Sequence, residues 1–236
     1  MLGSAAPVAA TGYRIEGRAI TRATLAAAAL ALAAILVIPR RVWRWARLGV
    51  TAVHESGHAV VALLVGRKVT AIHLRPDSSG VTIHYRPGGR LRRFMTAAAG
   101  YPAPGALGLG GAALILYREP RIWLVALLAL GVVNVVLWIR NLFGLVVMAG
   151  WIGGLGWLFV RGTAGVDALV SAVAVWYLVL GGLRAALEVP RSPAPSDAAD
   201  LGRLLHLPIW LCKAGFVLMG TAAVVASAGV LAAAPR

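Results

Sequence analysis

Long apolar runs without charged side chains dominate the chain, and short polar segments separate them. The runs cover residues 23–38, 94–117, 122–139, 141–160, 168–183 and 214–235. A further run, residues 48–65, has a similar length but contains His54, Glu55 and His58 near its middle. Because a membrane-spanning helix needs about 20 mostly apolar residues, the pattern predicts an all-α polytopic membrane protein with six to seven transmembrane helices. The number of transmembrane helices is six if the run 94–117, which Gly and Pro interrupt, is re-entrant.

The polar segments between the runs predict a hairpin and a short helix. Residues 69–74 and 81–85 are β-prone and flank turn-forming residues 76–80, which predicts a β-hairpin within the loop 66–93. The Pro-rich loop 184–207 contains a helix start, so a short helix is expected over residues 197–206. Residues 1–22 are an N-terminal tail, and the first run is interpreted as a retained anchor. Residues 1–236 are therefore expected to form a single transmembrane domain.

Composition excludes an ordinary soluble or disordered protein. The chain is 60% hydrophobic and 13% charged, whereas soluble domains average about 45–50% and 25%. Its 23 Lys and Arg outweigh 8 Asp and Glu, but the arginines are dispersed between the apolar runs. This distribution argues against nucleic-acid binding and favours contact with anionic lipids. Four tryptophans are expected to anchor the membrane interface: Trp43, Trp45, Trp123 and Trp138.

Residues 54–58 form an H-E-x-x-H motif inside the run 48–65. Four residues are about one helical turn, so His54 and His58 leave the same helix face and can bind one zinc ion. Zinc activates water for attack on a carbonyl, and Glu55 stands where it can accept the proton. With 5 His among 236 residues, chance produces such a motif only about 0.002 times. Polar side chains at this depth in a membrane are costly unless they face a cavity or a metal.

This motif within an apolar helix, followed by Gly66-Arg67 and a β-hairpin, resembles the site-2-protease family of intramembrane zinc metalloproteases. Further phrases are similar to a small actinobacterial branch of that family: Ser79-Gly80-Val81-Thr82, Ala99-Gly100-Tyr101, Arg140-Asn141-Leu142-Phe143-Gly144 and Ser196-Asp197-Ala198. A high-GC bacterial source also fits the preference for Arg over Lys. The resemblance implies zinc as cofactor and a membrane-embedded protein as substrate. It also implies that the hairpin holds the unwound substrate by strand addition.

The third metal ligand is the least determined part of the expected site. In the family it is usually an Asp of an Asn-x-x-Pro…Asp-Gly motif on a later span. Asn141 resembles the start of that motif, but no Asp-Gly follows it. Asp197 is the expected ligand because it stands at a helix start after a Pro-rich turn and matches the Ser-Asp-Ala phrase. The alternatives are Asp200, Asp167, Glu188, His84 and His73, whereas Glu16, Asp77 and Glu119 are assigned to loops.

Three functions agree with this sequence. The leading hypothesis is a zinc-dependent intramembrane endopeptidase with His54, His58 and Asp197 as metal ligands and Glu55 as general base. The second is a non-proteolytic relative of the same fold, acting as a membrane binding or chaperone module, because the Asp-Gly motif is missing. The third is a metal transporter, which should repeat polar residues on several spans. In each case we expect a multi-pass protein of the bacterial cell membrane without a nucleic-acid partner.

Overall fold

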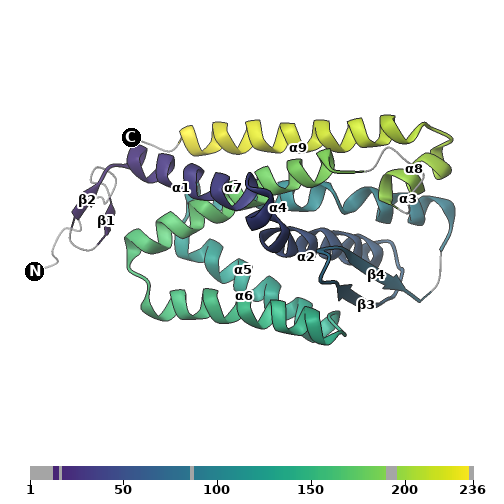
Figure 1. Cartoon of the computed structure of the whole chain (residues 1–236), viewed down its shortest axis with the longest axis horizontal. Coiled ribbons are helices and arrows are strands. Elements are labelled where there is room, and N and C mark those ends of the chain that lie inside the picture. Colours follow the sequence, from purple (N-terminus) through teal and green to yellow (C-terminus); the bar gives the residue numbers. More distant parts are fainter. Residues whose placement is uncertain (1–12, 16–17, 86–87, 190–195, 234–236) are drawn as a thin grey trace, which may run out of the picture.

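The computed structural model describes residues 13–15, 18–85, 88–189 and 196–233, and helices dominate this part of the chain (Figure 1). The helices are α1 (Arg22–Val37), α2 (Arg40–Leu64), α3 (Arg90–Ala99), α4 (Pro102–Tyr117), α5 (Pro120–Leu137), α6 (Leu142–Arg161), α7 (Ala164–Leu187), α8 (Asp197–Leu205) and α9 (Ile209–Ala232). The strands are β1 (Tyr13–Ile15), β2 (Arg18–Ile20), β3 (Val69–Leu74) and β4 (Gly80–His84). The predicted all-α fold with a short hairpin after the motif helix is confirmed. The expected N-terminal tail differs, because β1 and β2 form an antiparallel pair there.

Within the described residues, α5, α6, α7 and α9 are each long and apolar enough to cross a membrane. Two bent pairs raise the number of candidate spans to six: α1 with α2, bent by 100°, and α3 with α4, bent by 56°. The apolar runs 23–38 and 48–65 therefore belong to one bent pair of helices, because α1, with 16 residues, is too short to be a candidate span by itself. The second bend falls at Gly100 and Tyr101, directly before Pro102, where Gly and Pro interrupt the run.

Helix α7 lies at the centre of the bundle and packs against α1, α4 and α9. Close approach to α4 depends on Gly108, where a Cβ would lie 2.6 Å from Cγ1 of Val179. Trp43, Trp123 and Trp138 are buried inside the protein, with 3%, 1% and 6% of their surface exposed. Their predicted role as interface anchors is therefore wrong. Of the four tryptophans named from the sequence, only Trp45 is exposed.

The corner between α1 and α2 is fixed by side chains from the end of α7. Arg184 donates hydrogen bonds to the carbonyls of Val37 and Ile38 and places its guanidinium 4.9 Å from the ring centre of Trp43. Glu188 accepts hydrogen bonds from Trp43 at 3.0 Å and from Arg184 at 2.8 Å. Partial burial raises the pKa of Glu188, but these two hydrogen bonds outweigh it, and its pKa falls below the usual value. The ionised network sets the direction in which α2 leaves the corner.

The β3–β4 hairpin is attached along β3 to the link between α5 and α6. The amide of Ile72 donates to the carbonyl of Trp138 at 2.7 Å, and the amide of Arg140 donates to the carbonyl of Ile72 at 3.3 Å. The Asn141 side chain donates to the carbonyl of Leu74 at 2.7 Å and accepts from its amide at 3.2 Å. Asn141 thus acts as one more strand residue. In the part of the chain that the structure describes, no backbone hydrogen bond joins the outer edge of β4 to another segment.

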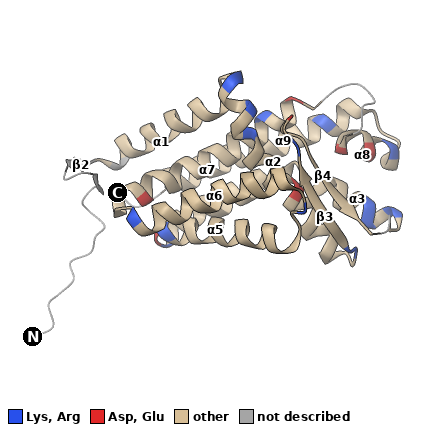
Figure 2. Cartoon of the chain, turned by 60° about the horizontal axis from the view of Figure 1, so that its bottom comes forward, with Lys and Arg blue, Asp and Glu red and all other residues tan. Residues whose placement is uncertain are grey.

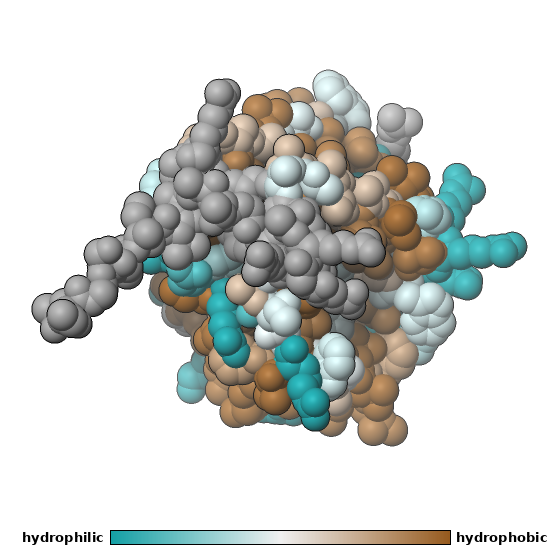
Figure 3. Space-filling model, turned by 90° about the vertical axis from the view of Figure 1, so that its left-hand side faces the viewer, coloured by the Kyte–Doolittle hydropathy of each residue, from teal (hydrophilic) through white to brown (hydrophobic). Residues whose placement is uncertain are grey.

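Charged side chains gather at the ends of the bundle and at the α1–α2 corner, and they leave most of the helix length uncharged (Figure 2). One end combines α3, α8 and the hairpin. At the opposite end, the described residues that are visible in Figure 3 are mostly apolar, and a few polar side chains project between them. This separation is typical of a bundle whose middle lies in the apolar part of a membrane.

Candidate metal centre

Helix α2 brings the H-E-x-x-H side chains to one place, as the helical spacing predicts. The Nε2 atoms of His54 and His58 lie 3.1 Å apart. Their rings stand nearly perpendicular, with 4.7 Å between the ring centres. His58 and Glu55 are buried, and His54 is partly buried. Two imidazole nitrogens therefore share one small volume against α3 and α8.

Helix α8 supplies the third side chain of this group. Its first residue is Asp197, because the Ser196 hydroxyl caps the helix by accepting a backbone N–H of the first turn at 3.2 Å. Ala198 and Leu201 pack with Phe216 of α9 in one buried cluster, which holds α8 against the bundle. As a result, Oδ2 of Asp197 lies 3.1 Å from Nε2 of His54 and 3.1 Å from Nε2 of His58.

These three atoms form a triangle with 3.1 Å sides. Ligand atoms at about 2.0–2.1 Å from a tetrahedral zinc ion are about 3.3 Å apart, so the triangle has the size of a three-ligand zinc site. Burial raises the pKa of Asp197, but the two imidazoles outweigh it and hold the pKa well below its usual value. Among the described residues, His54, His58 and Asp197 are the one group of His, Cys, Asp or Glu close enough to hold a metal ion.

Helix α3 and the bend after it orient the two imidazoles. Nδ1 of His58 donates to the carbonyl of Thr96 at 2.7 Å. Because a carbonyl only accepts, the neutral ring has its proton on Nδ1, and Nε2 keeps its lone pair for a metal. At the bend, the ring of Tyr101 lies edge to face on His54 with 4.6 Å between centres. A Cβ at Gly100 would lie 2.4 Å from Nε2 of His58, so glycine leaves the space that a metal ion needs.

The hairpin covers Glu55 from the other side. Its Oε2 accepts a hydrogen bond of 2.6 Å from the Thr82 hydroxyl. A Cβ at Gly80 would lie 2.7 Å from both Cγ and Oε1 of Glu55, so only glycine allows β4 to cross so closely. One turn earlier on α2, Thr51 donates to the carbonyl of Ser78 at 2.9 Å and holds the turn of the hairpin in place. The Glu55 carboxylate is therefore held in one orientation.

A cavity of about 650 Å³ lies between α2, α3, α8 and the hairpin. His54, Glu55, His58 and Asp197 all line it, and so do residues of β4, whose outer edge has no backbone hydrogen-bond partner among the described residues. The candidate metal ligands, a carboxylate and an open strand edge thus face the same space. This combination suits hydrolysis of an extended peptide.

The alternative third ligands lie outside the triangle. Asp200 lines the same cavity but forms an ion pair with Arg203. Asp167 lies at the start of α7, 3.9 Å from Arg121, at the opposite end of the bundle. Glu188 belongs to the α1–α2 corner described above.

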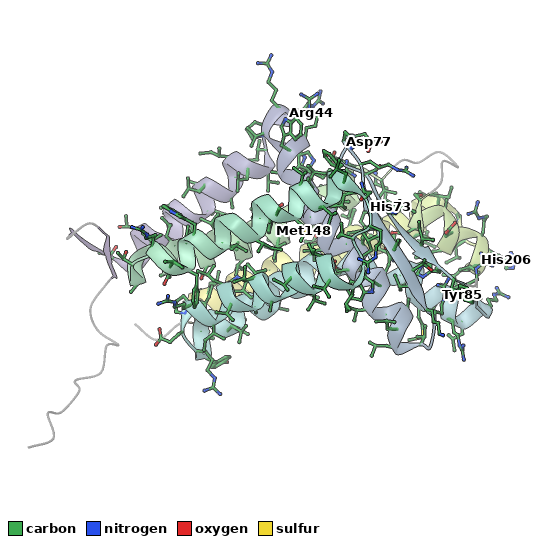
Figure 4. All side chains as sticks on the ribbon, turned by 90° about the horizontal axis from the view of Figure 1, so that it is seen from below. Arg44, His73, Asp77, Tyr85, Met148 and His206 are labelled. Carbon is green, nitrogen blue, oxygen red and sulfur yellow. The ribbon has the colours of Figure 1, made fainter. Side chains whose placement is uncertain are left out.

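The histidine alternatives and the loop acids have other surroundings. His84 lines the cavity from β4, where burial and the positive charge of Arg67 lower its pKa to about 4. His73 lies on β3, and Asp77 lies in the hairpin turn, where it accepts hydrogen bonds from Ser79 (Figure 4). Glu119 precedes α5 as expected. Glu16 lies outside the described residues.

Sequence reasoning missed the groups that support the candidate ligands. Thr96 contributes through its backbone carbonyl, which leaves no signature in the sequence. Asn141 was noticed as a motif fragment, but its bonds to Leu74 depend on tertiary structure. Thr82 could have been found, because Gly80, Thr82 and His84 alternate along β4 and therefore share one face.

Two histidines, one aspartate and one glutamate line a single cavity of this polytopic helical protein, an arrangement that is typical of membrane-embedded metallopeptidases. The family model described as Peptidase M50B-like matches residues 27–227. The chain therefore belongs to this family, within the site-2-protease family that the motif resembles, and it is an integral membrane protein. No curated protein and no solved structure is significantly similar to it.

Proposed function

We propose that the chain is a zinc-dependent intramembrane endopeptidase that hydrolyses peptide bonds of transmembrane protein substrates. His54, His58 and Asp197 hold the metal, and Glu55 is the general base. The observation that supports this most directly is the 3.1 Å triangle of ligand atoms in the cavity that Glu55 also lines. When bound, zinc supplies Lewis-acid chemistry, which activates water and polarises the scissile carbonyl.

Glu55 moves the proton in this reaction. Its carboxylate accepts a proton from water as the water oxygen bonds to the carbonyl carbon, and it delivers that proton to the amine nitrogen as the C–N bond breaks. The Thr82 hydroxyl keeps the carboxylate oriented, and the Thr96 carbonyl keeps the His58 ring in the tautomer that a metal requires. The negative charge of Asp197 compensates the metal charge inside the bundle.

The substrate binds as an extended segment along β4. A transmembrane helix hides its peptide bonds in its own hydrogen bonds, so cleavage requires local unwinding, and an unwound segment needs new backbone partners. The outer edge of β4 offers such partners within the cavity. The other side of the hairpin is already closed by the link between α5 and α6. These contacts leave the outer edge of β4 as the docking edge for the substrate.

Anionic lipids bind at the α1–α2 corner. Arg40, Arg41 and Arg44 are exposed there, and Figure 4 shows Arg44 projecting away from the bundle. Arginines in this position attract anionic headgroups, by about 1 kcal/mol each near a membrane surface.

The test uses purified protein in bicelles, a single-span peptide substrate and controlled zinc. We expect zinc-dependent cleavage by the natural chain and a loss of about 10²–10⁴-fold in kcat for Glu55→Gln, because a general base is removed. The variant should retain its metal, as measured by elemental analysis. Equal cleavage by the two proteins would refute the peptidase, and a chain that binds the peptide without cleaving it would favour the non-proteolytic alternative.

Metal content tests the ligand set independently of cleavage. We expect one zinc ion per chain and a loss of at least tenfold in zinc affinity for Asp197→Ala, because one of three protein ligands is removed. Asp77→Ala is the matched control, since Asp77 lies in the exposed hairpin turn. Undiminished affinity in Asp197→Ala would exclude this aspartate as the third ligand.

A further inference from the structure

Two arginines line the wall of the cavity beyond the far end of β4. Arg67 follows α2, and Arg93 lies in the first turn of α3. Burial lowers the pKa of Arg67, and the positive charge of Arg93 lowers it further. His84 completes this wall from β4. Positive side chains at the wall of a cavity make it attractive to an anionic ligand.

The carboxylates that line the cavity are engaged elsewhere. Glu55 and Asp197 belong to the candidate metal centre, and Asp200 pairs with Arg203. Among the described residues, no carboxylate forms an ion pair with Arg93. By contrast, Arg47, which also lines the cavity, is paired with Glu188 at 3.2 Å. The positive charge of Arg93 is therefore available to a ligand.

The register of β4 relates the cavity wall at Arg67 and Arg93 to the candidate metal centre. Gly80 and Thr82 contact Glu55, and His84 lies on the same face two residues further along the strand. A strand advances about 3.3 Å per residue, so His84 is about 13 Å from Gly80. Ile83 is exposed on the opposite face. A substrate strand paired with β4 has the same period, so side chains two and four positions from the scissile bond face the arginine wall.

We propose that Arg93, on the cavity wall that Arg67 and His84 also line, forms a specificity subsite for an acidic substrate side chain two to four residues from the scissile bond. This inference rests on the proposed function, because the substrate must lie along β4. An Asp or Glu carboxylate accepts charge-assisted hydrogen bonds from the Arg93 guanidinium, and such bonds are stronger than neutral ones. The subsite selects the substrate and fixes its register relative to Glu55.

The test uses a set of single-span peptides in bicelles that share one sequence and differ at one position. Glu, Gln or Lys is placed at each of four positions on either side of the cleaved bond, which mass spectrometry locates. We expect one Glu peptide to exceed its Gln twin by about fivefold or more in kcat/KM, as for a partly solvated ion pair. Arg93→Glu should reverse the order and make the Lys peptide the best substrate, and Arg93→Gln should abolish the preference.

Arg92→Glu is the matched control. It makes the same change one residue away on α3, where the side chain is exposed and does not line the cavity. The charge preference should be unchanged in this variant. Cleavage without charge preference, or a preference that Arg93→Glu leaves intact, would overturn the subsite and leave the peptidase standing.

Binding to a Glu55→Gln background separates the subsite from the proposed function. With fluorescent peptides, we expect the Glu peptide to bind about fivefold more tightly than its Gln twin. Arg93→Glu in the same background should remove this difference. Charge-dependent binding without cleavage by the natural chain would refute the peptidase and support the subsite. Equal affinities for the Glu and Gln peptides would overturn the subsite.

Discussion

Thr82→Val tests how strongly the hairpin controls Glu55, the proposed general base. Valine keeps the shape of threonine but removes the hydroxyl that donates to Oε2 of Glu55 at 2.6 Å. Glu55 is only 5% exposed, so water does not simply replace this donor. A hydrogen bond to a charged group contributes about 1.5–3 kcal/mol, which corresponds to a decrease of about 10–100-fold in kcat. KM should change by less than about threefold, because the backbone edge of β4 is unaltered.

The assay is steady-state cleavage of one reconstituted single-span peptide at saturating zinc. Thr82→Ser should restore most of kcat, since it returns the hydroxyl, whereas a general loss of hairpin structure would not be rescued. Thr70→Val is the control, because Thr70 lies exposed on β3 of the same hairpin. A kcat for Thr82→Val within about twofold of the natural chain would refute the positioning role of this hydroxyl.

Three further changes probe the surroundings of the site. Asn141→Ala removes two hydrogen bonds to β3, worth about 1–3 kcal/mol together, so amide hydrogen exchange in the hairpin should accelerate about 10–100-fold; unchanged exchange would contradict the anchoring role. Gly100→Ala places a methyl group where Nε2 of His58 lies 2.4 Å away, so zinc affinity in a chelator competition should fall at least tenfold, whereas Gly89→Ala, in open space, should not change it. His84 has a pKa of about 4 in the folded chain, so between pH 6.5 and pH 4 the unfolded chain binds a proton that the folded chain does not. Thermal stability should therefore decrease as the pH falls through this range, and less so in His84→Gln; an equal loss in both proteins would argue against this linkage.

Local patterns predicted the parts of the site that depend on neighbouring residues. The spacing of His54 and His58 fixes a common helix face, and Ser196 after a Pro-rich segment marks the start of α8 one residue later. Both are properties of a helix and its cap, which a short stretch of sequence determines. The prediction of Asp197 as the third ligand drew on that helix start and on the family resemblance. In the structure, Oδ2 of Asp197 lies 3.1 Å from Nε2 of both histidines, and its role as a metal ligand stays a prediction.

Tertiary contacts explain what the sequence did not indicate. Trp43 and Trp123 have the flanking positions of interface anchors, but the packing of α7 and α4 against them places both inside the bundle. The 100° bend between α1 and α2 depends on Arg184, which is 146 residues away along the chain from Ile38. No periodicity within the first two apolar runs can report such a partner. The same holds for Asn141, whose side-chain amide bonds to the backbone of Leu74, 67 residues earlier in the chain.

The order in which the chain is made has a consequence for when it can act. His58 and Asp197 are separated by 139 residues, and helices α3 to α7 lie between them. Synthesis proceeds from the N-terminus, so α2 enters the membrane long before the nine residues of α8 leave the ribosome. During that interval the growing chain has two histidines and a glutamate of the candidate centre but lacks Asp197. Late arrival of one short helix therefore delays assembly of the complete candidate centre.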